Sequence, residues 1–142
     1  MKTSKELLSS ITKTTQMGQL GIRCVMDYAQ NKNLKDALHS QLNEYDMIEQ
    51  EAFKIANQRG WEIQELNPAL KLMSKTYSRA NLMMGNVDSR IAAMMINGNT
   101  KGMIKSIKNQ HHSNKTDLRI NKLGEKLLMF ETANIRQMQE YL

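Results

Sequence analysis

The sequence predicts an all-α protein, a single antiparallel up-and-down four-helix bundle that occupies residues 1–142. Three observations predict this class. Apolar residues recur every three or four positions over most of the chain, which is the spacing of amphipathic helices. Only 5% of the residues are aromatic and only one is proline, which argues against a β-sandwich. The length of 142 residues suits one domain with one core.

The first helix is predicted over about residues 4–30. Thr3 can cap its start, and Glu6 three residues later would complete a capping box. Its apolar stripe consists of Leu7, Leu8, Ile11, Thr15, Gly18, Ile22, Val25 and Ala29. Gly18 and Gly21 each cost about 1 kcal/mol relative to alanine inside a helix. They indicate either the close approach of a neighbouring helix or room for a ligand.

The second helix is predicted over about residues 33–59, with Asn33 as its N-cap and Gly60 just beyond its end. Its stripe consists of Leu34, Leu38, Gln41, Leu42, Tyr45, Ile48, Ala52, Ile55 and Ala56. The links before and after this helix are short. Consecutive helices are therefore expected to run antiparallel.

The third helix is predicted over about residues 68–96, because Asn67-Pro68 is a strong helix start and a heptad spacing follows it. Asn97-Gly98-Asn99 is expected to end it. A short extra helix is predicted over about residues 100–109, and the fourth long helix over about residues 116–141.

Several classes of function find no support in the sequence. A single cysteine, Cys24, excludes an internal disulfide and a cysteine-based zinc site, and we expect it to be a small buried apolar side chain. Phosphate-binding loops, nucleophile elbows and His-Glu-x-x-His motifs are absent, so enzyme activity has no positive indication. No apolar run reaches the ~20 residues of a membrane span, and the amino terminus does not resemble a signal peptide. We expect a cytoplasmic protein.

Polar residues interrupt the apolar stripes near the predicted midplane of the bundle. They are Thr15, Gln19, Glu44, Tyr45, Asn81, Glu131 and Asn134. A buried polar group without a partner costs on the order of 1–3 kcal/mol. This layer is therefore either a hydrogen-bond network that sets helix register or a binding site.

Four segments carry a resemblance to a known family. They are Thr14-Thr15-Gln16-Met17-Gly18-Gln19, Gln41-Leu42-Asn43-Glu44-Tyr45, Asn99-Thr100-Lys101-Gly102-Met103-Ile104-Lys105 and Glu131-Thr132-Ala133-Asn134-Ile135-Arg136-Gln137. On these segments the chain resembles, over nearly its whole length, a family of small uncharacterised bacterial ferritin-like bundles. The resemblance implies a fold and no established activity.

The sequence departs from the pattern of ferritin-like diiron proteins, which place Glu-x-x-His on two helices. Glu44 is followed three residues later by Met47, and Glu131 by Asn134, and neither replaces imidazole well on iron. We therefore expect no cofactor and no metal site, and a structural or binding role. The alternative is an iron or manganese site centred on Glu44 and Glu131, with Asn134 and Asp88 as further candidates.

A second alternative is binding of an anion or of nucleic acid by the basic segment 100–122. Its basic residues are Lys101, Lys105, Lys108, Lys115, Arg119 and Lys122, opposed by Asp117 alone. Aromatic residues do not interleave with them, so base stacking and hence nucleic acid are disfavoured. The acidic stretch 44–51 offers a complementary face, and we expect a homo-oligomer.

Histidines offer a further, weaker possibility of a surface metal site. Asp36 and His39 lie one helical turn apart, and alternating helix directions would bring His39 to the same end as His111 and His112. Three exposed histidines without further ligands are the simpler interpretation.

Overall fold

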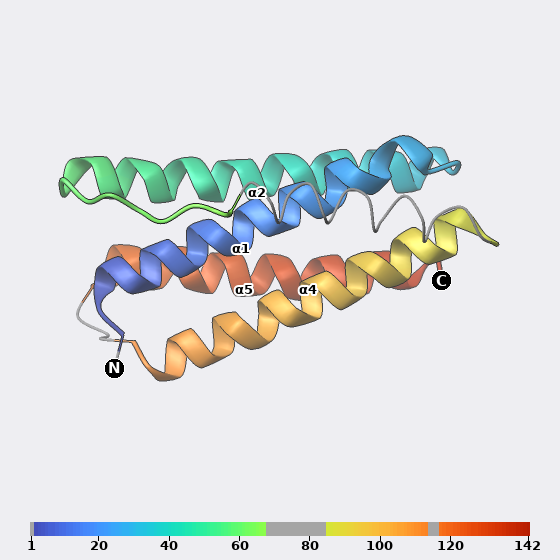
Figure 1. The fold of residues 1–142 in the computed structure, drawn as a ribbon. Coiled ribbons are helices and arrows are strands. Elements are labelled where there is room, and N and C mark those ends of the chain that lie inside the picture. The colour runs from blue at the N-terminus through green and yellow to red at the C-terminus, as the bar shows by residue number, and fades with distance from the viewer. Residues whose placement is uncertain (1, 68–84, 114–116) are drawn as a thin grey trace.

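The computed structural model describes residues 2–67, 85–113 and 117–142. Within these residues the chain forms four long helices, as the apolar spacing predicts (Figure 1). They are α1 (Ser4–Val25), α2 (Lys32–Gln58), α4 (Val87–His111) and α5 (Leu118–Gln139). A short 3-10 turn, Met26–Tyr28, follows α1. An isolated bridge between Lys2 and Ser113 is the one β-type pairing in the described part of the chain.

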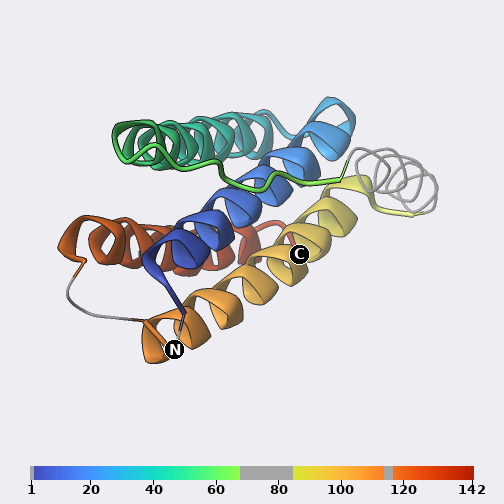
Figure 2. The ribbon, with the colours of Figure 1, turned by 60° about the vertical axis from the view of Figure 1, so that its left-hand side comes forward.

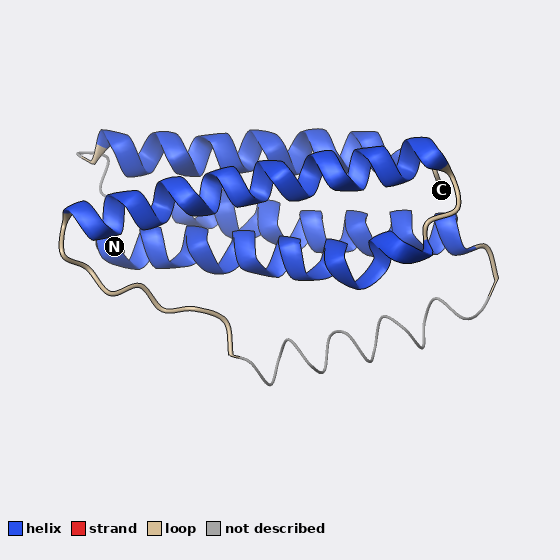
Figure 3. Ribbon diagram, turned by 90° about the horizontal axis from the view of Figure 1, so that it is seen from above, coloured by secondary structure: helices blue, strands red, loops and turns tan. Residues whose placement is uncertain are grey.

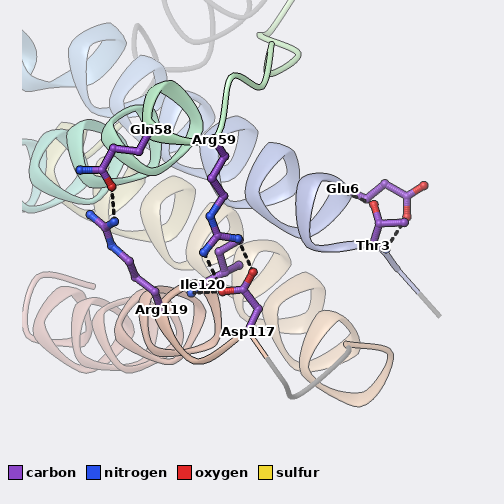
Figure 4. A network of polar contacts seen from close by, with 7 residues as sticks. All are labelled: Thr3, Glu6, Gln58, Arg59, Asp117, Arg119 and Ile120. Atoms are coloured by element: carbon purple, nitrogen blue, oxygen red, sulfur yellow. Dashed lines mark hydrogen bonds and ion pairs between the residues drawn. The ribbon is translucent and has the colours of Figure 1, made fainter.

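The predicted capping box at the start of α1 is confirmed. The backbone N–H of Glu6 donates to Thr3 Oγ1 at 3.1 Å, and the Thr3 N–H donates to the Glu6 carboxylate at 2.9 Å (Figure 4). The helix ends at Val25, earlier than expected, because the chain tightens there into the 3-10 turn. At the start of α2, Asn31 is the cap in place of Asn33, and its Oδ1 accepts from two backbone N–H groups.

The helix α4 differs most from the sequence prediction. It continues without a break through Asn97, Gly98 and Asn99, so the predicted end near residue 96 is wrong. The short extra helix predicted at 100–109 is the second half of α4. Gly85, with φ of 83°, and Asn86, whose side chain accepts from the Ser89 N–H, precede its first turn. The earlier part of the predicted third helix, residues 68–84, lies outside the described residues.

The order of helix directions along the chain also differs from the predicted alternation. Each helix is antiparallel to its two main neighbours, but α2 and α4 run the same way (Figures 1 and 2). Contacts at the two ends of α4 establish its direction. At its start, the Asp88 carboxylate accepts from the N–H groups of Gln30 and Asn31, just before α2 begins. Near its end, Asn109 donates to Ser10 in the first half of α1. The directions are therefore up, down, down, up, so the end of α2 and the start of α4 lie at opposite ends of the bundle.

The segment that follows α2, residues 61–67, lies beside α1. Leu66 donates its N–H to Gln16 Oε1 at 3.0 Å, and Lys13 donates to Gln64 Oε1 at 2.9 Å. Residues 61–67 contain no helix, so the expected short turn between the second and third helices is in fact an extended segment (Figure 3).

The ends of α2 and α5 are tied by polar contacts (Figure 4). Asp117 caps α5 through the Ile120 N–H and forms an ion pair with Arg59. The guanidinium of Arg59 lowers the pKa of the Asp117 carboxyl group through their hydrogen bond. Arg119 pairs with Glu51 at 2.9 Å and also with Gln58. Part of the acidic stretch thus meets the basic segment within one chain.

We expect Asp88→Ala to lower the free energy of unfolding by about 1–2 kcal/mol, because both carboxylate oxygens accept backbone N–H groups of the α1–α2 link. Urea unfolding would measure the loss. Asp27→Ala is the matched control, since Asp27 is exposed and makes no hydrogen bond with a described residue. Equal stability of the two variants would contradict a clamping role for Asp88.

Candidate functional site

Five polar side chains are buried in the bundle interior, and we call them the buried polar cluster: Gln19 of α1, Tyr45 of α2, Asn99 of α4, and Glu131 and Asn134 of α5. None is more than 4% exposed. The hydroxyl oxygen of Tyr45 lies 2.8 Å from Asn99 Oδ1 and 2.9 Å from Glu131 Oε2. One phenol therefore joins three helices. Its ring also packs edge-on against Phe130, with centroids 4.8 Å apart.

Two helical glycines make room for this cluster. A Cβ on Gly18 would come within 2.4 Å of the Tyr45 ring, and a Cβ on Gly102 would come within 2.6 Å of Glu131 Oε1. Both distances are far below van der Waals contact. The packing of Tyr45 and Glu131 therefore requires these two glycines. At Gly18 this confirms the predicted close approach of a neighbouring helix, which is α2.

Burial of the cluster favours the neutral form of Glu131. The Tyr45 hydroxyl has one hydrogen and lies within hydrogen-bonding distance of two acceptors, Asn99 Oδ1 and Glu131 Oε2. Burial raises the pKa of Glu131 to about 8. Burial, and then the nearby Glu131, also raise the pKa of the Tyr45 hydroxyl. The hydrogen bond from the Tyr45 hydroxyl opposes the rise in the pKa of Glu131, because it stabilises the ionised carboxylate of Glu131.

Three amide nitrogens of the cluster are left over. Gln19 Nε2, Asn99 Nδ2 and Asn134 Nδ2 are buried and have no hydrogen-bond partner among the described residues. Each such donor costs on the order of 1–3 kcal/mol if nothing accepts from it. A network that only set helix register would be expected to pair these donors.

A partly open cavity of about 460 Å³ lies between α1 and α4, and Tyr45, Asn99 and Glu131 line it. Its apolar lining comes from Met17, Leu20, Leu66, Met94 and Met95. Lys13, Lys101 and Lys105 also line it. Asn99, whose buried amide nitrogen has no partner among the described residues, is thus one of the residues that line a largely apolar space.

Two more glycines, Gly21 of α1 and Gly98 of α4, border the same cavity. A Cβ at either position would meet no described atom within 4 Å. Neither has a positive φ, so an alanine would fit the helix and stabilise it by about 1 kcal/mol. Packing of the described residues does not require these glycines, but they do leave the cavity wider.

The predicted polar layer is assembled in part. Gln19, Tyr45, Glu131 and Asn134 are all buried, and Tyr45 and Glu131 are joined by a hydrogen bond. Thr15 is buried but donates to the Thr12 carbonyl of its own helix at 2.7 Å. Glu44 is only half-buried and makes no hydrogen bond or ion pair with a described residue. Asn81 lies outside the described residues.

Asn99 and Gly102 were missed by sequence reasoning, because the Asn-Gly-Asn run was expected to end a helix. The sequence does contain a pattern that indicates both residues: small or apolar residues recur every three or four positions through the Asn-Gly-Asn run. Its buried members are Ala92, Met95, Asn99, Gly102 and Ser106.

The described residues do not fit a ferritin-like metal pair. No group of three or more His, Cys, Asp or Glu side chains occurs among them. Glu131 is the one carboxyl group in the buried polar cluster, and Asp88 is used at the α1–α2 link. His39 lies in the first half of α2, whereas His111 and His112 follow the other end of the parallel α4, so these histidines do not converge.

The basic segment does not form one continuous patch in the described residues. Lys101, Lys105 and Lys108 share one face of α4 by their spacing. Arg119 lies against α2, where it pairs with Glu51 and contacts Gln58 (Figure 4). Lys122 is exposed on α5, and Lys115 lies outside the described residues.

These helices and contacts define an all-α four-helix protein with a polar cluster in its core and an adjoining cavity. None of the helices in the described ranges is long and apolar enough to cross a membrane. No family model matches the chain. No curated protein matches it either.

A solved structure does share the fold: that of YcfI from Rhodopseudomonas palustris, a protein provisionally described as structural. The two chains superpose with a TM-score of 0.73 over 98% of this chain and 94% of YcfI. Their sequences are 15% identical. The likeness establishes the fold alone.

Proposed function

We propose that this chain is a non-catalytic binding protein whose cavity between α1 and α4 holds a small, mostly apolar molecule. The proposal rests on two features seen together. Asn99 Nδ2 is a buried donor without a partner among the described residues, and Asn99 lines the cavity. The cavity is wide beside it because Gly21 and Gly98 carry no side chain. A ligand oxygen that accepts from the Asn99 amide would remove its desolvation cost. The methionines around the cavity suit apolar ligands of irregular shape.

A purely structural role, like the one provisionally described for YcfI, is the main alternative. It accounts for Gly18 and Gly102, because these glycines seat Tyr45 and Glu131. It does not account for Gly21 and Gly98, or for the unpaired amides. These features favour binding.

We also infer a ferritin-like relationship without the metal centre. The support is the chain order: up, down, down, up with one long crossover is the connectivity of ferritin-like bundles. The side chains favour binding of an organic molecule over iron or manganese, since the neutral Glu131 is surrounded by phenol and amide groups.

The cavity can be tested with N-phenyl-1-naphthylamine, a neutral dye that fluoresces in apolar sites. We expect the protein to bind one equivalent. Gly98→Leu should weaken binding by about tenfold or more, because the new side chain fills the space beside Asn99 and removes apolar contacts. Thermal melting of the same samples would show that the variant is folded.

Asn97→Leu is the matched control, because residue 97 is exposed and does not line the cavity. It adds the same apolar group one position away and should leave the affinity unchanged. An absence of binding to the unmodified protein would overturn the proposal. So would equal affinity in folded Gly98→Leu.

A further inference from the structure

The charges around the cavity are of one sign. Its described lining includes the ammonium-bearing residues Lys13, Lys101 and Lys105 and a single acidic residue, Glu131. Glu131 is buried, and burial raises its pKa to about 8, which favours its neutral form at pH 7. The described part of the lining therefore carries a net positive charge, and no ionised acidic side chain within that part offsets it.

The three lysines have no ion-pair partner among the described residues, where the ion pairs are Arg59–Asp117 and Arg119–Glu51. Lys13 donates to the neutral amide of Gln64 at 2.9 Å. Lys101 and Lys105 lie one turn apart on α4, so their side chains share a face. These ammonium groups remain available to an anion.

A wider, more open groove of about 760 Å³ adjoins the cavity, and Lys13 and Lys105 line both spaces. Lys2 and Lys5 also line the groove. Burial, and then repulsion from Lys2 and Lys13, lower the pKa of the Lys105 ammonium group. A bound anion would relieve that repulsion. The acidic residues Glu6 and Glu62 line the groove and not the cavity.

We infer that the ligand of this cavity is an amphipathic organic anion, with its apolar body among the methionines and its anionic head at Lys13, Lys101 and Lys105. The inference rests on the proposed binding function and adds the ligand class. The observations that carry it are the uncompensated lysines of the lining, the apolar walls beside them, and the buried Asn99 amide. The ligand chemistry is an aliphatic or aromatic body with a carboxylate, sulfonate or phosphate head.

Decanoate and 1-decanol provide a direct test, because they share a hydrocarbon chain and differ in the head group. Each would be titrated against protein loaded with N-phenyl-1-naphthylamine, and dye displacement would be measured. We expect decanoate to bind about tenfold more tightly than decanol at low salt, which corresponds to one favourable charge interaction near a protein surface. About 1 M salt should remove most of the preference.

The double variant Lys101→Gln/Lys105→Gln identifies the lysines responsible. It should lose the preference for decanoate and retain the affinity for decanol. Lys54→Gln/Lys126→Gln is the charge-matched control, since both residues are exposed and neither lines the cavity. The control should behave like the unmodified protein.

The outcomes separate this inference from the function on which it rests. Equal displacement by decanoate and decanol would overturn the anion inference and leave the binding function standing. A decanoate preference that survives the Lys101→Gln/Lys105→Gln change would also overturn it. If the dye and both competitors fail to bind, the proposed function and the inference fall together.

Discussion

The protein is expected to lose stability as pH rises from about 5 to 8, with a contribution from Glu131 of up to about 1.4 kcal/mol per pH unit. Glu131 is 1% exposed, and burial raises its pKa from an ordinary value of 4.5 to about 8. Between these values the folded protein holds a proton that the unfolded chain has released. Raising the pH therefore favours the unfolded chain. The contribution is fully present below about pH 4.5 and is lost as pH passes the folded pKa.

The variant Glu131→Gln isolates this effect, because a glutamine keeps the shape and its amide oxygen can still accept from the Tyr45 hydroxyl, but it has no ionisable proton. Its stability should match that of the unmodified protein near pH 5 and exceed it by a few kcal/mol near pH 8. Urea unfolding at several pH values would measure the difference. Glu125→Gln, at an exposed position of the same helix, should show no such divergence. Parallel pH profiles for Glu131→Gln and the unmodified protein would refute a neutral buried Glu131.

The second large effect is expected from alanine at two glycines of α1 that lie three residues apart. Gly18→Ala should lower the free energy of unfolding by about 1–3 kcal/mol, because its Cβ would lie 2.4 Å from the buried Tyr45 ring. Gly21→Ala should raise it by about 0.5–1 kcal/mol, because its Cβ meets no described atom within 4 Å and alanine favours the helix.

Chemical denaturation of the two variants would measure both changes in the free energy of unfolding, which we expect to have opposite signs. Gly18→Ala should also weaken the Tyr45 contacts, and the near-ultraviolet circular dichroism of the tyrosine would report this. Stabilisation by both substitutions would show that Tyr45 does not pack against α1 as described. Destabilisation by both would show that the space beside Gly21 is filled.

The local features of this protein follow from neighbouring residues. The Thr3–Glu6 capping box depends on two side chains three residues apart, so the sequence predicts it without knowledge of the fold. Helical spacing likewise predicts that Gln19, Tyr45, Glu131 and Asn134 face inward, and they do.

The sequence by itself determined the helical class and most of the inward-facing positions, because both depend on periodicity within single segments. Only the tertiary structure decided that α4 continues through Gly98. A glycine inside a helix costs about 1 kcal/mol relative to alanine. The hydrogen bond between Asn99 and Tyr45 and the packing of Glu131 against Gly102 outweigh this cost. The tertiary structure also decided that α2 and α4 run in the same direction. The cavity, with the Asn99 amide and the lysines that line it, depends on this arrangement, because residues distant in sequence form its walls.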